Sequence, residues 1–163
     1  MLFRSKIKKA VTMLLETKGS WKASDLNVLI PMAGAGSRFA EAGYSFPKPL
    51  IDVNGKPMIQ AVVENLAIDA TYTYIVQKEH YEKYNLMYLL NAITPNCNIV
   101  QVDGVTEGAA VTALLAKEFI NNDNPLIMAN SDQIVDWNSR EFIYDMFTKN
   151  ADGGMAKIGR AHV

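Results

Sequence analysis

Short β-branched or apolar runs alternate with stretches of helical periodicity from residue 26 to residue 156, and this alternation restricts the fold more than any other feature. Parallel strands joined by helices need crossover connections, which are almost always right-handed and place helices on both faces of the sheet. We therefore expect an α/β fold with a Rossmann-like, mostly parallel sheet. The expected strands are Asn27–Met32, Thr73–Val76, Ile99–Val102, Pro125–Ala129 and Gly153–Ala156, and the expected helices are Pro57–Ala70, Glu79–Ile93, Glu107–Asn121 and Asn138–Asn150.

The two ends of the chain are predicted to lie outside the domain formed by residues 26–156. Residues 1–25 begin with apolar residues at helical spacing among basic ones. Two interpretations are open: an accessory helix or the tail of an upstream domain, and a basic amphipathic helix on a membrane surface. Residues 157–163 translate one reading frame of a widely used sequencing adapter. We therefore expect the natural coding sequence to stop near Ala156, with the domain truncated at its C-terminus.

Charge and cysteine content exclude several classes of function. The formal net charge is −1, so there is no general attraction to nucleic acid, and any anion site has to be built locally. No apolar run approaches the length needed to span a membrane. The single cysteine, Cys97, permits no intrachain disulfide, which fits a reducing cytoplasm, and we interpret it as a structural residue.

A loop of small residues, Ala33-Gly34-Ala35-Gly36-Ser37-Arg38-Phe39, directly follows the first expected strand. Small side chains allow successive backbone N–H groups to approach phosphate oxygens, and Arg38 adds a positively charged fork. Two glycines in such a turn are a weak signal by themselves. A dinucleotide fingerprint would need a third glycine where Phe39 stands, and a Walker loop would need Gly-Lys-Ser/Thr.

The segment Phe46-Pro47-Lys48-Pro49-Leu50 places one lysine between two prolines. Proline restricts its own φ angle and the conformation of the preceding residue, so the backbone that carries Lys48 is stiff. A lysine positioned in this way suits a triphosphate. The segment Ile51–Ile59 then predicts a strand, an Asn-Gly turn and a helix that begins near a proline.

An acidic tip, Asn130-Ser131-Asp132-Gln133, follows the apolar run Leu126–Ala129. Because Mg²⁺ prefers one or two carboxylates together with phosphate oxygens, Asp132 is the candidate metal ligand. The alternative is an aspartate in an ordinary loop turn.

The chain contains three motifs in this order: Gly-x-Gly-x-Arg-Phe, Pro-Lys-Pro-Leu and Gly-Lys-Pro-Met. Together they resemble the opening of the sugar-nucleotide nucleotidylyltransferases. That family includes glucose-1-phosphate thymidylyl- and uridylyltransferases and phosphocholine cytidylyltransferases, and the resemblance covers about residues 26–156. It implies the nucleotide-diphospho-sugar transferase type of fold. It also implies an enzyme that joins a nucleoside triphosphate to a sugar 1-phosphate or a choline-like phosphorylated acceptor, with Mg²⁺ as cofactor and release of pyrophosphate.

The resemblance also implies roles for individual residues. The loop of Ala33, Gly34, Ala35, Gly36, Ser37 and Arg38 would wrap the triphosphate, with Arg38 orienting the leaving pyrophosphate. Lys48 would contact phosphate during transfer, and Asp132 would hold the metal. Gly108 and Glu107 would lie beside the base. The family usually has Gly-Asp where this chain has Ser131-Asp132, and often another polar residue near Glu107, which leaves the identity of the base open.

Other polar residues have simpler interpretations. Thr106 and Asp136 are expected to cap the segments that follow them. His80 is expected on the exposed first turn of a helix, and the tyrosines of residues 72–88 are expected to pack against the fold. Gln77 follows the second strand, where it either contacts nucleotide or lies on the surface.

Two other functions are open. A glycosyltransferase of related fold would be expected to carry an Asp-x-Asp metal motif, whereas Asn130-Ser131-Asp132 provides one carboxylate. A non-catalytic nucleotide-binding module would bind nucleotide without turnover. The second alternative is serious for this polypeptide because, by the resemblance, a second metal carboxylate and much of the acceptor site lie beyond its last residue.

Overall fold

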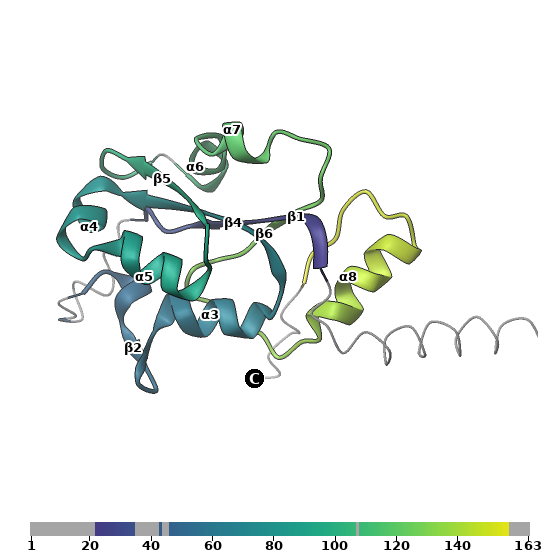
Figure 1. Cartoon of the computed structure of the whole chain (residues 1–163), viewed down its shortest axis with the longest axis horizontal. Coiled ribbons are helices and arrows are strands. Elements are labelled where there is room, and N and C mark those ends of the chain that lie inside the picture. The colour runs from purple at the N-terminus through teal and green to yellow at the C-terminus, as the bar shows by residue number, and fades with distance from the viewer. Residues whose placement is uncertain (1–21, 35–42, 44–45, 107, 157–163) are drawn as a thin grey trace, which may run out of the picture.

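The computed structural model describes residues 22–34, 43, 46–106 and 108–156. Within these residues, four parallel strands form a sheet of order β5-β4-β1-β6 (Figure 1). The strands are β1 (Lys22–Pro31), β4 (Asp69–Gln77), β5 (Asn98–Val102) and β6 (Leu126–Met128). The expected parallel α/β sheet is confirmed, and β1 begins earlier than residue 27, where the sequence predicted it.

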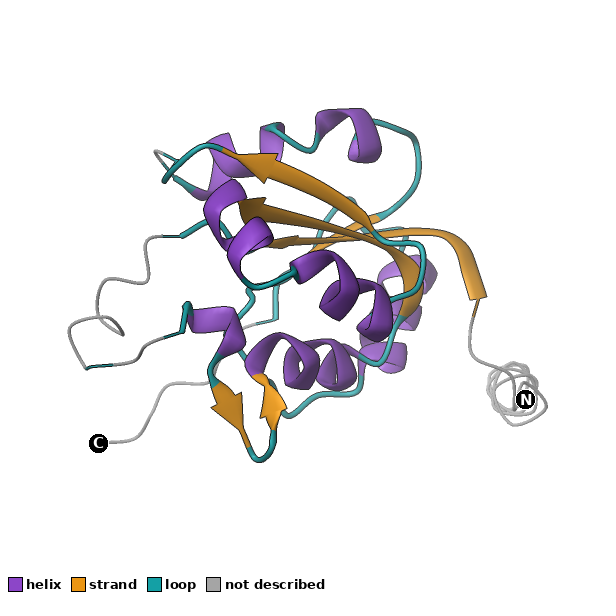
Figure 2. Cartoon of the chain, turned by 60° about the vertical axis from the view of Figure 1, so that its left-hand side comes forward, coloured by secondary structure: helices purple, strands orange, loops and turns teal. Residues whose placement is uncertain are grey.

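Helices cover both faces of the sheet, as Figure 2 shows. Successive residues of β1 point to opposite faces, so Val28 and Ile30 join one apolar cluster and Leu29 joins the other. The first cluster lies under α3 (Met58–Leu66) and α5 (Leu86–Ile93), and the second lies under α6 (Ala109–Leu114) and α7 (Lys117–Ile120). The central strands are therefore buried on both sides.

A short hairpin precedes α3. Strands β2 (Asp52–Val53) and β3 (Lys56–Pro57) pair antiparallel around Asn54 and Gly55, which both have positive φ angles, of 54° and 83°. These angles belong to the type I′ turn that Asn-Gly favours. The Asp52 carboxylate accepts a hydrogen bond from the Gly55 N–H at 3.0 Å. The predicted strand, turn and helix are confirmed.

Three of the expected helices are shorter or broken. Helix α3 ends at Leu66, because Ala67 adopts a left-handed conformation and residues 69 and 70 already belong to β4. The helix expected at 79–93 divides into α4 (Lys78–Lys83) and α5, with Asn85 at a φ of 49° between them. The helix expected at 107–121 divides into α6 and α7. Helical periodicity does not reveal a positive φ angle, so the first two interruptions could not be predicted from the sequence.

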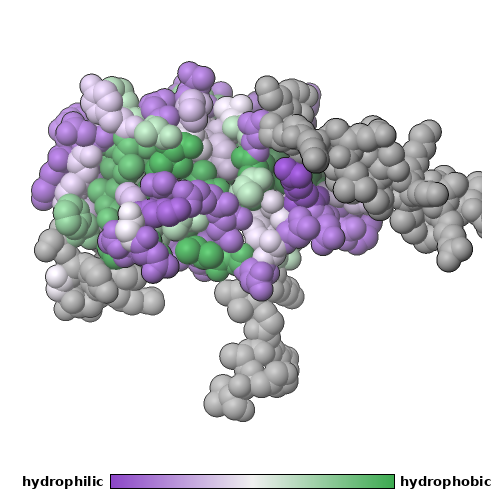
Figure 3. All heavy atoms as spheres, turned by 60° about the horizontal axis from the view of Figure 1, so that its bottom comes forward, coloured by the Kyte–Doolittle hydropathy of each residue, from purple (hydrophilic) through white to green (hydrophobic). Residues whose placement is uncertain are grey.

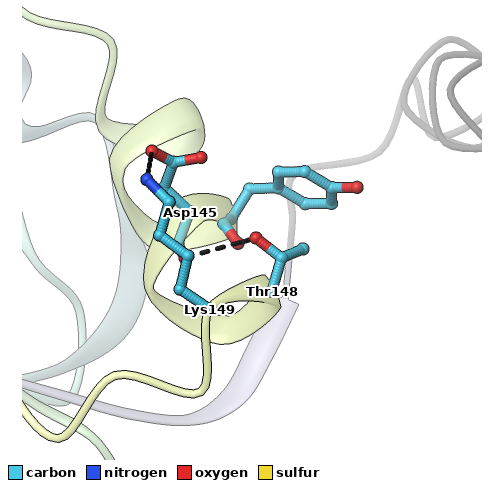
Figure 4. Close-up of polar contacts among 4 residues, drawn as sticks. Asp145, Thr148 and Lys149 are labelled. Carbon is cyan, nitrogen blue, oxygen red and sulfur yellow. Dashed lines mark hydrogen bonds and ion pairs between the residues drawn. The ribbon is translucent and has the colours of Figure 1, made fainter.

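The last helix, α8 (Ser139–Thr148), agrees with its prediction to within two residues at each end. Its C-terminal turn carries an ion pair between Lys149 and Asp145 at 2.6 Å (Figure 4). The strand expected at 153–156 is absent from the described residues, and that prediction is wrong. Instead the chain packs against α8: a β-carbon at Gly154 would lie 2.5 Å from the sulfur of the flexible Met146 side chain, which would then have to move.

Several large apolar side chains are exposed on the helices and on β6, and Figure 3 shows apolar surface among polar side chains on one face. The exposed apolar residues of α6 and β6 are Val111, Leu114, Leu126 and Met128. Strand β6 is the edge strand on its side of the sheet among the described residues. None of the described helices combines the length and hydropathy that a membrane span requires.

Candidate functional site

The strands of the sheet are added on one side of β1 and then on the other, so the strand order has a switch point between β1 and β6. From β1 the chain proceeds through β4 to β5 on one side, and β6 then pairs with the other side of β1. In parallel sheets, ligands bind beyond the carboxyl ends of the strands at such a switch point. The residues that follow β1 and β6 are the start of the small-residue loop, Ala33 and Gly34, and the acidic tip, so the ends of two neighbouring parallel strands bring them to the same edge.

Lys48 reaches this edge from a separate segment. It begins the short 3-10 helix η1 (Lys48–Leu50), which Pro47 precedes. Pro49 is buried, and the Leu50 and Ile51 N–H groups donate to the Pro47 and Lys48 carbonyls at 2.8 and 3.3 Å. The turn that carries Lys48 is therefore held by its own backbone, as the two prolines predict.

The Lys48 ammonium forms an ion pair with the Asp132 carboxylate. The two side chains are 31% and 25% exposed, so the pair is partly shielded while remaining open to a ligand. Both residues were predicted to act on the triphosphate, one through phosphate and one through metal. The structure brings them into contact with each other, which the sequence did not predict.

Asn65 fixes the segment that follows Asp132. Its amide donates to the Val135 carbonyl at 2.8 Å and its side-chain carbonyl accepts from the Val135 N–H at 2.9 Å. The Trp137 indole donates to the Asn65 carbonyl at 3.3 Å. These contacts tie the chain after the acidic tip to the C-terminal turn of α3. Sequence reasoning missed Asn65, because no local pattern reveals a contact between residues so far apart in the chain.

Gln77, the last residue of β4, is buried beside the start of the small-residue loop. Its amide nitrogen donates to the Ala33 carbonyl at 3.0 Å and to the Gly34 carbonyl at 3.2 Å. The interpretation of Gln77 as a surface residue is wrong, since the side chain spans from β4 to the loop after β1.

The loop before α6 contains a backbone conformation that requires glycine. Gly108 has a φ of 155° and is the residue before the first turn of α6. Its carbonyl accepts hydrogen bonds from the Thr112 hydroxyl at 2.8 Å and the Thr112 N–H at 3.0 Å. Thr106 does not cap the helix, contrary to its prediction: its hydroxyl instead pairs with that of Thr112.

The structure places some predicted site residues and not others. Gly34, Lys48, Gly108 and Asp132 are placed, as is Ala33, which is buried. The predicted roles of Ala35, Gly36, Ser37, Arg38 and Glu107 concern residues that lie outside the described ones. Asp136 is exposed and does not cap α8. Asn138 does so, accepting a hydrogen bond from the Glu141 N–H at 3.2 Å, because it stands directly before the first turn.

The residues given simpler interpretations mostly behave as expected. Tyr72 and Tyr74 are buried and their rings stack 6.1 Å apart, while Tyr88 is 71% exposed and does not pack as predicted. His80 is partly exposed on α4 beside Tyr84. Cys97 packs against the larger core cluster, where burial raises the pKa of its thiol. A raised thiol pKa disfavours the nucleophilic thiolate, in agreement with a structural role.

Asp132 could hold a divalent metal ion together with phosphate oxygens. The described residues contain no group of three or more His, Cys, Asp or Glu side chains that would enclose an ion. Asp132 offers one partly exposed carboxylate at the edge where phosphate is expected. Mg²⁺ characteristically combines one or two carboxylates with phosphate oxygens and water.

Comparison with known proteins identifies the family to which the chain belongs. The model of the nucleotidyl transferase family matches residues 27–163. A mannose-1-phosphate guanyltransferase of Pichia angusta is 31% identical over 134 residues, which are 80% of this chain and 36% of that protein. A 2-aminoethylphosphonate cytidylyltransferase of Lancefieldella rimae is 49% identical over 49 residues, 30% of this chain and 20% of that protein.

A solved structure shows the same fold. The nucleoside-diphosphate-sugar pyrophosphorylase of Vibrio cholerae RC9 superposes with a TM-score of 0.57 at 21% identity, covering 83% of this chain and 62% of that one. The chain thus spans little more than a third of the length of the guanyltransferase and under two thirds of the structural neighbour.

Proposed function

Because this chain belongs to the nucleotidyl transferase family, we propose that it forms the nucleotide-binding part of an enzyme that transfers a nucleoside monophosphate to a phosphorylated small molecule. The observation that carries the proposal is the ion pair between Lys48 and Asp132 at the carboxyl edge of the sheet. A cation proposed to bind phosphate and a carboxylate proposed to hold a metal ion meet there from distant parts of the chain.

The reaction proposed is an in-line displacement. A phosphate oxygen of the acceptor attacks the α-phosphorus of the nucleoside triphosphate, a new P–O bond forms, and the bond to the β-phosphate oxygen breaks to release pyrophosphate. Both reactants are anions, so catalysis depends on positioning and on stabilisation of charge. The Lys48 ammonium would bind a phosphate oxygen, and Arg38 would orient the leaving pyrophosphate.

Asp132 would hold Mg²⁺, which when bound neutralises phosphate charge and fixes the conformation of the triphosphate. In the ligand-free chain that carboxylate contacts Lys48. Binding of metal and nucleotide together therefore exchanges one ion pair for two new interactions, ammonium with phosphate and carboxylate with metal. We accordingly expect metal and nucleotide to strengthen each other's binding.

The acceptor belongs to a class of small phosphorylated molecules. The names of the relatives mention mannose 1-phosphate and 2-aminoethylphosphonate, which correspond to the sugar phosphate and the choline-like alternatives. Family membership favours both over glycosyl transfer. We further propose a cytoplasmic setting, since Cys97 is a free thiol.

Two experiments test the proposal. The 163-residue chain is titrated with each of four nucleoside triphosphates with and without Mg²⁺, and we expect binding that Mg²⁺ strengthens. Failure of all four to bind would contradict the proposal. A longer protein that contains this chain is then assayed for pyrophosphate release with sugar 1-phosphates, phosphocholine and 2-aminoethylphosphonate. Nucleotide binding without turnover on any acceptor would favour the non-catalytic module.

A further inference from the structure

Gln77 connects two neighbouring strands at the edge where the nucleotide is proposed to bind. It ends β4, its side chain is 9% exposed, and its amide nitrogen bridges the Ala33 and Gly34 carbonyls. Beside it, the Met32 N–H donates to the Ile75 carbonyl at 2.7 Å, so the chain leaves β1 in a fixed direction. Gln77 belongs to none of the three motifs that resemble the family, and its place follows from the structure alone.

The two hydrogen bonds fix the orientation of the first peptide groups of the loop. In a trans peptide the C=O and the following N–H point in opposite directions. The Ala33 carbonyl points to Gln77, so the Gly34 N–H points away from it. A β-carbon built at Gly34 would meet no atom within 4 Å, so there is room beside this residue. A backbone N–H held at the end of a parallel strand suits an anionic oxygen.

We propose that Gln77 is a positioning residue for nucleotide binding, and that its amide holds the Gly34 N–H in the orientation that receives a phosphate oxygen of the nucleoside triphosphate. The inference rests on the proposed function, since it assigns a task within the same site. The contact with nucleotide is made by Gly34, and Gln77 acts through the peptide groups that it holds. A preorganised donor loses less entropy on binding than one that must first be ordered.

A purely structural role makes a different prediction. Ala33 is almost fully buried, so its carbonyl needs a hydrogen-bond donor whether or not a ligand binds. Loss of the Gln77 amide would then lower stability and leave the affinity for phosphate unchanged. A positioning role predicts that both the stability of the protein and its affinity for phosphate fall.

The test uses the 163-residue chain with two substitutions on β4. Gln77→Met keeps the side-chain volume and removes both donors. Tyr74→Phe is the matched control, since it removes a buried hydrogen bond from the same strand, the one between the Tyr74 and Thr94 hydroxyls at 3.0 Å. Thr94 keeps a partner in the control, because its hydroxyl also donates to the Leu90 carbonyl at 3.1 Å.

Each variant is titrated with inorganic tripolyphosphate and with the four nucleoside triphosphates in the presence of Mg²⁺, and its thermal unfolding is recorded. Tripolyphosphate probes the phosphate contacts without a base. We expect Gln77→Met to weaken tripolyphosphate and nucleotide by the same factor, about tenfold, as for two lost hydrogen bonds that orient a donor. Tyr74→Phe should lower the melting temperature with less than a twofold change in either affinity.

Each outcome decides the proposal. Equal affinities of Gln77→Met and the unaltered chain would overturn the positioning role and leave the proposed function standing. Weaker nucleotide binding with unchanged tripolyphosphate binding would also overturn it, because Gln77 would then act on the base. If the unaltered chain binds no nucleotide, the proposed function fails and the positioning role fails with it.

A measurement on the unaltered chain applies if Gln77→Met does not fold. Amide hydrogen exchange of Gly34 is followed with and without tripolyphosphate. We expect the Gly34 amide to exchange at least tenfold more slowly when the anion is bound. Exchange at an unchanged rate under saturating tripolyphosphate would overturn the proposal.

Discussion

The ammonium of Lys48 and the carboxylate of Asp132 form an ion pair in the ligand-free protein, although one begins η1 and the other follows β6. Each is the residue that its own motif assigns to the triphosphate. The pair therefore holds both side chains together in the absence of ligand. Under the proposed function, movement of Lys48 onto phosphate would release the Asp132 carboxylate for metal, and the two binding events would be linked.

Two substitutions of Lys48 should distinguish the contribution of its positive charge from that of the shape of its ammonium group. In a longer, active protein, Lys48→Ala should lower the transfer rate by on the order of 10²-fold, because a preorganised charge on the transition state is lost. Lys48→Arg should restore activity only partly, since a planar fork differs from a compact ammonium. Steady-state assays of pyrophosphate release measure both. Activity of Lys48→Ala within threefold of the unaltered enzyme would remove Lys48 from the mechanism.

Substitution of Asp132 should change the dependence on metal. Asp132→Asn keeps the shape of the side chain and removes its charge, so the Mg²⁺ concentration needed for half-maximal nucleotide binding should rise. Titration of the 163-residue chain with Mg²⁺ at fixed nucleotide measures this. Asp136→Asn is the matched control, because Asp136 is an exposed carboxylate nearby in sequence. An unchanged Mg²⁺ titration of Asp132→Asn would place the metal elsewhere.

The main features of the fold could be predicted because each rests on a local pattern. Alternation of apolar runs predicted the parallel sheet, and Asn54-Gly55 predicted the hairpin turn. Features that depend on long-range contacts or on single φ angles could not be predicted from the sequence. Asn85, at a φ of 49°, breaks one expected helix, and the chain at Gly154 packs on α8 where a strand was expected. Both outcomes depend on tertiary packing, which overrides local propensity.

The site shows the same division. Sequence motifs identified Lys48 and Asp132, because a lysine between prolines and an acidic tip after a strand are visible along the chain. The sequence left two interpretations of Gln77 open, and it did not point to Asn65 at all. Each acts by hydrogen bonds to the backbone of a segment distant in sequence. Such residues hold motifs in place without belonging to them, so only the folded chain identifies them.

Alkaline pH should destabilise the protein through its buried tyrosines. Burial, assisted by the charge of Asp69, raises the pKa of Tyr72 to about 12. The folded state therefore keeps the phenol neutral while the unfolded chain ionises near pH 10. Because the folded pKa is the higher one, this contribution to stability is complete below about pH 10 and is lost as the pH rises toward 12.

Tyr72→Phe should therefore reduce the loss of stability between pH 9 and pH 11.5, as measured by urea unfolding at intervals across that range. Some loss should persist, because burial also raises the pKa of Tyr74. Tyr88→Phe is the control, since its ring is 71% exposed. An equal slope for Tyr72→Phe and the unaltered chain would contradict the assignment.

The last prediction concerns how much of the activity these residues support. The described part of the chain contains the start of the small-residue loop, Lys48, Gly108 and Asp132, so the 163-residue chain should bind nucleoside triphosphate. We predict weak binding, marginal stability and negligible turnover. The chain spans little more than a third of the length of the guanyltransferase relative, and we propose that a second metal carboxylate and much of the acceptor site belong to the remaining length. Loss of acceptor positioning removes an advantage worth up to about 7–11 kcal/mol.

A protein that contains this chain and has the full length of its relatives should release pyrophosphate and bind nucleotide more strongly. It should also aggregate less, as measured by light scattering, if the added chain covers the apolar residues Leu126 and Met128 on edge strand β6. The control is an extension of equal length and composition in scrambled order. Robust pyrophosphate release by the 163-residue chain would contradict the prediction.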